Sequence, residues 1–176
     1  KIQYNSPVVL TFTFLSFGVL LLHWVTGGTT TRLLFSVYPC SWGDPLGYIR
    51  LFGHVLGHAD FDHYAGNMLL FLLIGPILEE KYGSNKLLLM IALVALITGL
   101  VDVLFMNVIL LGASGIVFMA IILVSAVSAG EGRIPLTFII VVGVYIGKEI
   151  VDGILVQDSI SHLTHIIGGV CGGGFG

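Results

Sequence analysis

The sequence predicts an all-α membrane protein: a single domain, residues 1–176, forming a bundle of six transmembrane helices with a short central fourth helix. Three observations predict this class. Of the 176 residues, 56% are hydrophobic and only 10% are charged, whereas a soluble domain has about 25% charged residues. The apolar residues gather in runs of roughly 17–25, the length that crosses a bilayer. The 24 glycines suit membrane helices that pack closely together.

The first three helices follow from apolar runs and their breaks. Pro7–Val25 is a continuous apolar run and is the first predicted helix. Residues 26–60 are rich in Gly, Thr, Pro and aromatic residues, which indicates an interfacial loop with short helices. The second helix, Phe61–Tyr82, ends in charged residues followed by Gly83. The third helix is expected at 87–104.

The fourth predicted helix, residues 114–129, is unusual because it is short. At 1.5 Å per residue it rises about 24 Å, whereas the hydrocarbon core is about 30 Å thick. Its N-terminus should therefore lie inside the membrane, and residues 102–112 before it should be non-helical. Such backbone survives only where protein or a water-filled cavity covers it. The fifth helix, 135–152, and the sixth, Ser159–Phe175, complete the bundle.

The short helix opens with Gly112, Ala113, Ser114 and Gly115. A serine at a helix start is often only a cap. The functional alternative is a nucleophile at the positive end of the helix dipole, where free N–H groups could hold an oxyanion. The flanking glycines would let a substrate backbone approach closely.

A histidine lies within the apolar sixth helix. His165 is followed by Gly168 and Gly172, a spacing that gives the helix a face of small residues for close packing. The histidine could simply be buried and bonded to a carbonyl. However, an ionisable group within a span is a functional candidate, and a neutral imidazole beside a serine hydroxyl is the minimum needed to activate that serine. If the glycine face packs on the start of the fourth helix, His165 would meet Ser114.

Polar residues also cluster around the start of the second helix. His63 and Asn67 are four residues apart, so they share one helix face. Both donate hydrogen bonds, as an oxyanion hole requires, although they could also be polar contacts between helices. His54 and His58 share the same spacing and suggest a metal site, but the run between them lacks the glutamate of the H-E-x-x-H pattern. No metal is therefore expected.

These motifs together resemble the rhomboid family of intramembrane serine proteases, of the prokaryotic type with a six-helix core. The family's G-x-S-G motif is matched at the start of the fourth helix, and its H-x-x-G-x-x-x-G motif in the sixth. The family's histidines and asparagine near the second helix are matched as well. Arg50 stands where members often have the arginine of a Trp-Arg pair, with Ile49 in place of the tryptophan. Glu79 followed by Gly83 resembles the family's end of the second helix.

The resemblance implies a Ser-His dyad without an aspartate and without a cofactor. Ser114 would be the nucleophile and His165 the base, and the oxyanion donors would be the Ser114 N–H, His63 and Asn67. Phe118 would stack on the catalytic imidazole. His162, one turn earlier, is a rival base that lacks the glycine face immediately after it.

The resemblance also implies the setting of the reaction. Substrates would be transmembrane segments of other membrane proteins, which enter between the fifth helix and the loop at about 153–159. The N-terminus would lie inside a bacterial inner membrane, and the active site would open to the outer, periplasmic or extracellular side. The carboxylates of Asp102, Glu149 and Asp152 are interpreted as structural, with Asp152 in position to pair with Lys148.

Two other functions stay open at this point. The first is a non-catalytic rhomboid-like scaffold that binds membrane helices. The second is a transporter with histidines as a relay, although no internal repeat is apparent. The formal net charge of −3 argues against nucleic-acid binding, and Cys40 and Cys171 match no zinc spacing.

Overall fold

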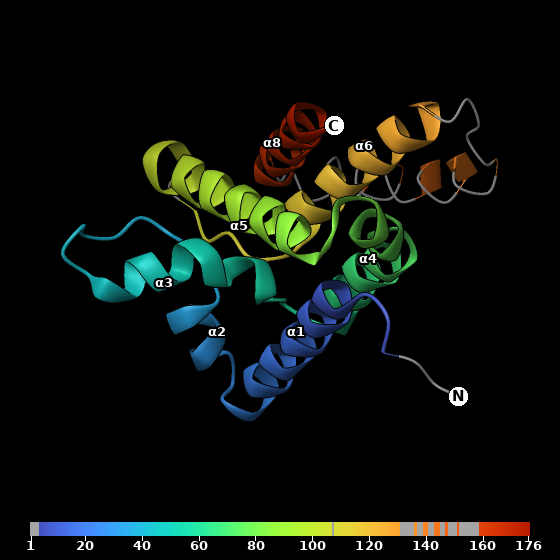
Figure 1. Cartoon of the computed structure of the whole chain (residues 1–176). Helices are drawn as coiled ribbons and strands as arrows, with labels where there is room; N and C mark the ends of the chain where they lie inside the picture. Colours follow the sequence, from blue (N-terminus) through green and yellow to red (C-terminus); the bar gives the residue numbers. More distant parts are fainter. Residues whose placement is uncertain are drawn as a thin grey trace.

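The computed structural model describes residues 4–106, 108–130 and 159–176, with scattered positions between 136 and 151. Within these residues the chain is helical apart from loops and one isolated β-bridge. Figure 1 shows α6 beside α4, α5 and α8, with α1 against α4 and α3 against α5 on the other side of the bundle. The fifth predicted helix, 135–152, lies for the most part outside the described residues.

The N-terminal half contains one long helix followed by a structured loop. Helix α1 covers Pro7–Val25, as predicted. The loop after it contains α2 (Thr29–Leu34), α3 (Pro45–Gly53) and a 3₁₀ turn at His54–Leu56. Helix α3 begins where the Asp44 carboxylate accepts the Leu46 N–H at 3.0 Å, a normal N-cap arrangement. The predicted interfacial loop with short helices is therefore confirmed.

Helices α4 and α5 form a tight hairpin. Helix α4 covers Phe61–Tyr82, as predicted, and its N-cap Asp60 accepts the His63 N–H at 2.8 Å. Gly83 has a φ of +83°, which favours glycine and turns the chain sharply. Helix α5 therefore starts at Ser84, earlier than the predicted residue 87, and runs to Val101 as Ser84–Val101.

One expectation about the segment before α6 is wrong. Residues 102–112 were expected to be non-helical, but Asp102–Met106 continues α5 as a π-helical turn. Helical hydrogen bonding is the cheapest way to satisfy backbone groups at membrane depth, so the apolar residues 103–106 extend the helix. Only the residues after this turn leave the helix before α6 begins.

The most buried element is the helix that the sequence predicted to be short and central. Helix α6 covers Ser114–Gly130, and it packs against α4, α5 and α8, the last covering Ser159–Phe175. Fully buried side chains line its first half, namely Ile116, Val117, Met119, Ala120 and Leu123, and Ala113 directly before the helix is buried as well.

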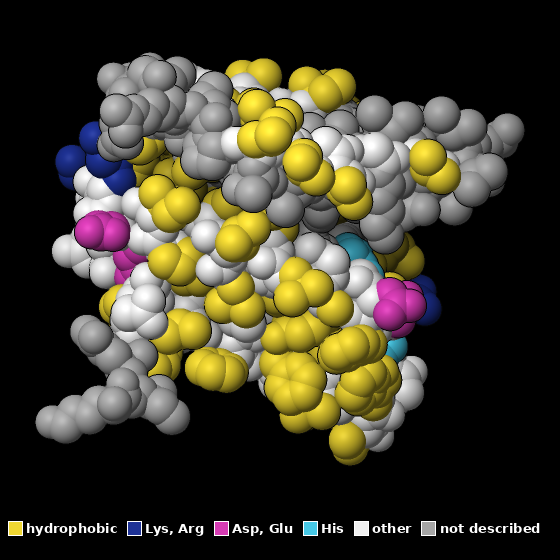
Figure 2. Space-filling model, turned by 90° about the vertical axis from the view of Figure 1, so that its right-hand side faces the viewer, with side chains coloured by type: hydrophobic (Ala, Val, Ile, Leu, Met, Phe, Trp, Pro, Cys, Tyr) yellow, Lys and Arg dark blue, Asp and Glu magenta, His cyan; other side chains and the backbone are white. Residues whose placement is uncertain are grey.

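The outer surface is apolar where a bilayer would touch it. Figure 2 shows hydrophobic side chains over the middle of one face, with charged side chains at two opposite edges. Three helices are long and apolar enough to cross a membrane, namely Pro7–Val25, Phe61–Tyr82 and Ser84–Met106. The protein is therefore an integral membrane protein, and the count of six spans stays a prediction.

Candidate active site

The backbone that leads into Ser114 is held by the first loop. Leu110 and Val37 exchange two hydrogen bonds of 2.9 Å, and the Gly112 N–H donates to the His54 carbonyl at 2.9 Å. Gly112 has a φ of +122°, a conformation that side chains disfavour. This irregular backbone is thus satisfied by protein, as membrane depth demands, and it delivers a half-buried Ser114 at the first position of α6.

Helices α6 and α8 touch through their backbones. A Cβ on Gly168 would overlap the carbonyl oxygen of Gly115, and a Cβ on Gly172 would lie 2.7 Å from the carbonyl oxygen of Met119. Because Gly168 meets Gly115 and Gly172 meets Met119, the two helices run in the same direction. The predicted glycine face therefore packs on the start of α6.

This contact brings His165 to the same end of the helix pair as Ser114. His165 lies one turn before Gly168, and Gly168 sits against the residue that follows Ser114. The imidazole is buried and stacks on the ring of Phe118, with centroids 4.2 Å apart and planes 11° apart. The stacked pair fixes the orientation of the imidazole from one side.

The candidate oxyanion residues lie on α4, next to the segment that leads into Ser114. The Nε2 atom of His63 is 2.7 Å from where a Cβ on Gly112 would stand, so the His63 ring faces the segment just before Ser114. Asn67 is buried one turn further along α4, and its amide donates to the His63 carbonyl at 3.0 Å. The site thus draws side chains from α4, α6 and α8.

His54 and His58 have structural partners rather than a shared ligand. The Nδ1 and Nε2 atoms of His54 lie 3.2 Å from the Arg50 carbonyl and the Thr98 hydroxyl. Burial lowers the pKa of His54 to about 4. Burial and the neighbouring His63 lower the pKa of His58 to about 3, so both rings stay neutral at pH 7. Among the described residues, no three metal-ligating side chains form a group.

Arg50 anchors the first loop with Tyr38 as its aromatic neighbour. Its guanidinium lies over the Tyr38 ring, 4.5 Å from the centroid, and pairs with Asp44. It also donates to the Tyr38 hydroxyl at 3.0 Å and to the Leu33 carbonyl at 3.3 Å. Tyr38 supplies the aromatic face that Ile49, which is exposed, cannot supply.

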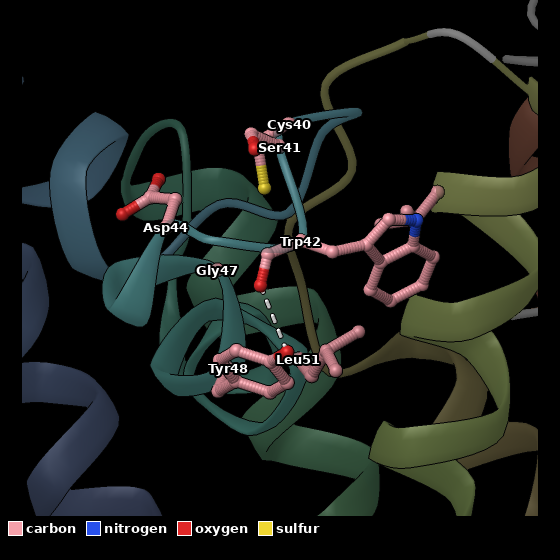
Figure 3. A pocket seen from close by; sticks show the side chains of 8 residues that line it. Cys40, Ser41, Trp42, Asp44, Gly47, Tyr48 and Leu51 are labelled. Carbon is pink, nitrogen blue, oxygen red and sulfur yellow. Dashed lines mark hydrogen bonds between the residues drawn. The ribbon is translucent and has the colours of Figure 1, made fainter.

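A small pocket of about 20 Å³ opens in the same loop, away from Ser114. Figure 3 shows its residues, with the Tyr48 hydroxyl bonded to the Trp42 carbonyl at 2.9 Å and the Trp42 ring extending toward α5. None of the residues singled out as catalytic lines this pocket. This pocket is a gap in the packing of the first loop.

The arrangement of α4, α6 and α8 agrees with the protein family that the sequence matches. A family model described as the rhomboid domain matches residues 45–176, which include α3 to α8. The chain belongs to the rhomboid family. Rhomboids are generally intramembrane serine proteases that act on membrane proteins within the bilayer, and the family includes inactive members. No curated protein matched the chain.

Several sequence predictions for this rhomboid fall outside the described residues. The His162 side chain, the proposed pair of Lys148 and Asp152, Glu149, and the gate loop up to residue 158 belong to this group. Sequence reasoning also missed a feature at the end of α5. Asp102 was interpreted as a structural residue in the loop before Ser114; it is a buried carboxylate that shares a small cavity with Thr98 of α5 and Thr164 of α8. The signal available in the sequence was an acid at the end of an apolar run.

Proposed function

We propose that this rhomboid is an active serine endopeptidase that cleaves transmembrane segments of membrane proteins with a Ser114–His165 dyad. The observation that carries the proposal is the seating of Gly168 on Gly115, with His165 stacked on Phe118 one turn away. Ser114 and His165, which are 51 residues apart in the sequence, are thereby brought to the same end of the helix pair. A scaffold would have no need for a serine, an imidazole and hydrogen-bond donors gathered there.

The reaction begins when the Ser114 hydroxyl oxygen attacks the carbonyl carbon of the scissile peptide bond. His165 accepts the hydroxyl proton, and the negative charge develops on the substrate oxygen. The Ser114 N–H at the start of α6, with His63 and Asn67, would donate hydrogen bonds to that oxygen. His165 then gives the proton to the leaving amine as the C–N bond breaks.

Water completes the cycle. His165 takes a proton from a water molecule, the resulting hydroxide attacks the acyl-enzyme carbonyl, and the ester bond to Ser114 breaks with return of the proton to its oxygen. An aspartate is not required where other contacts hold the imidazole, and stacking on Phe118 is such a contact. The reaction needs no cofactor or metal.

The proposal includes a direction for substrate access. The site would open to the outer side of a bacterial inner membrane, with the N-terminus inside. A substrate helix would enter between the fifth helix and the loop before α8 and unwind locally. Substrates with helix-breaking residues near the cleavage point should be cut faster, because glycine and proline lower the cost of unwinding.

A fluorophosphonate probe tests the dyad in proteoliposomes. Ser114→Ala and His165→Ala should abolish labelling of the serine and cleavage of a transmembrane substrate, whereas His162→Ala should keep both. Ser125→Ala is the matched control, because this serine lies on the same helix and its hydroxyl bonds to the Ile121 carbonyl at 2.7 Å. A folded Ser114→Ala protein that is still labelled would overturn the proposal.

The oxyanion assignment has its own measurement. Asn67→Ala should lower kcat about 10²–10³-fold with a small change in KM, since the lost bond forms only as charge develops. If kcat stays the same and only stability falls, Asn67 is a packing residue. A transporter, the remaining rival, would move ions across the vesicle membrane independently of Ser114.

A further inference from the structure

A buried carboxylate at the end of α5 has no hydrogen-bond partner among the residues that the structure describes. Asp102 is 2% exposed, and neither of its side-chain oxygens has a hydrogen-bond partner among the described residues. It occupies the first position of the π-helical turn after α5. Most buried polar atoms are satisfied in folded proteins, so two orphaned oxygens on one side chain require an explanation.

The surroundings of Asp102 favour an uncharged acid. The side chain borders a cavity of about 10 Å³, large enough for one water-sized group. The described residues that line the cavity beside Asp102 are two threonines and aliphatic or thioether side chains, none of them basic: Thr98, Val101, Met106, Leu110, Thr164 and Ile167. An unpaired ionised carboxylate in such a place costs several kcal/mol, whereas a protonated carboxyl is far cheaper.

The cavity joins Asp102 to the catalytic helices. Thr164 comes from α8 and directly precedes His165, and its methyl group lies 3.1 Å from where a Cβ on Gly115 would stand. Thr98 comes from α5 and contacts the same glycine position at 3.5 Å. Each threonine adjoins a described titratable group: His165 follows Thr164 in α8, and the His54 ring bonds to the Thr98 hydroxyl.

We propose that Asp102 is a positioning residue that works as a neutral carboxylic acid. In its protonated form it allows the start of α8 to seat against the end of α5, which holds His165 at the Ser114 end of α6. When Asp102 ionises, the charge draws water into the cavity and displaces the Thr164 turn, so fewer molecules have the dyad aligned. The inference rests on the proposed function of Ser114 and His165.

The pH dependence of kcat separates this role from simple packing. The wild-type protein should show a bell-shaped profile. On the acid limb kcat rises with pH as His165 loses its proton, and on the alkaline limb kcat falls as Asp102 ionises. On the alkaline limb kcat should fall by up to about tenfold per pH unit. Asp102→Asn should keep the acid limb and lose the alkaline limb, and Asp102→Thr, a second neutral variant, should do the same.

A second readout does not depend on catalysis. The thermal midpoint of the wild-type protein should fall as pH rises through the ionisation of Asp102, because the unfolded chain then binds fewer protons than the native state. The Asp102→Asn midpoint should lack that fall. Asp62→Asn is the matched control, since Asp62 is an exposed acid in the first turn of α4; it should leave both profiles as in the wild type.

The outcomes separate the two proposals. If the wild-type protein neither cleaves nor reacts with the probe, the proposed function fails, and the thermal midpoints still decide whether Asp102 is neutral. If the wild-type protein is active but shares its alkaline limb and its midpoint curve with Asp102→Asn, the positioning role is overturned. A folded Asp102→Asn protein that is inactive at every pH would also overturn it, because the ionised form would then be the required one.

Discussion

At the contact between α6 and α8, Gly168 and Gly172 bring the backbones of two helices together. At the contact between α1 and α4, side chains and one carboxylate join the helices instead. There, the Phe12 and Phe71 rings pack edge to face with centroids 5.4 Å apart. The Glu79 carboxylate accepts the N–H groups of α1. A side chain can move when a neighbour changes, but a carbonyl in a helix cannot. The first contact should therefore control the geometry of the dyad, and the second the stability of the fold.

The largest effect should come from adding one methyl group at the backbone contact. In Gly172→Ala the new Cβ would lie 2.7 Å from the Met119 carbonyl oxygen, so α8 must shift away from α6. A displacement of about 1 Å at a catalytic pair can cost 10²-fold in rate. We expect kcat/KM for a transmembrane substrate to fall about 100-fold in proteoliposomes.

Gly173→Ala is the control for that experiment. A Cβ at Gly173 would meet nothing within 4 Å, and alanine favours the helix over glycine by about 1 kcal/mol. This variant should keep full activity and gain slightly in thermal stability. If Gly172→Ala retains activity within about twofold, the backbone contact does not set the dyad.

The next effect should be on stability rather than catalysis. The buried Glu79 carboxylate accepts the N–H groups of Val8 and Val9 at 2.9 and 3.0 Å and the Ser84 hydroxyl at 2.7 Å. It thereby caps α1, whose own Ser6 makes no side-chain cap bond. Glu79→Ala should lower the free energy of unfolding by about 3 kcal/mol, since it leaves several buried donors without acceptors.

Activity per folded molecule should be nearly unchanged in Glu79→Ala, because the dyad lies on other helices. Glu80→Ala removes an exposed neighbour on the same turn and should change the free energy of unfolding by less than about 0.5 kcal/mol. Steric trapping or denaturation in mixed micelles measures the free energy of unfolding of both variants. An equal loss in the two variants would mean that the carboxylate of Glu79 does not hold α1.

Lowering the pH should reduce the folding stability that the first loop contributes through His54. His54 has its pKa lowered to about 4 by burial, whereas an unfolded histidine titrates near 6.5. As pH falls from about 6.5 to 4, the unfolded chain takes up a proton that the native state refuses, so stability declines. The decline should be on the order of 3 kcal/mol and should be reduced in His54→Gln. Because Asp102 shifts the wild-type midpoint in the opposite direction, the test is the difference between the two proteins: equal midpoint shifts in the wild type and in His54→Gln between pH 7 and 4 would contradict this.

The sequence predicted the elements that depend on local signals. Pro7–Val25, Phe61–Tyr82 and Ser159–Phe175 were predicted with the bounds the structure gives, because apolar runs and their breaks are local. The glycine face after His165 predicted a close helix contact, since small residues at a four-residue spacing serve close packing, but it did not by itself identify α6 as the partner.

The remaining features depend on contacts between distant residues. Nothing near Glu79 in the sequence shows that it caps α1, and nothing near Arg50 shows that Tyr38 supplies its aromatic partner. Where a side chain's partner lies tens of residues away, composition and spacing indicate only that the residue is unusual.

The smallest effect should come from the ring that stacks on the imidazole. Phe118→Leu removes the stacked face, which is worth about 0.5–1.5 kcal/mol beyond its buried area, so kcat should fall by roughly two- to tenfold with KM unchanged. Phe118→Tyr keeps the ring and should stay within about twofold of the wild type. If leucine and tyrosine behave alike, the backbone contact at Gly168 and Gly172 alone orients His165. If leucine costs as much as Gly172→Ala, side-chain packing sets the dyad geometry as strongly as the glycines do.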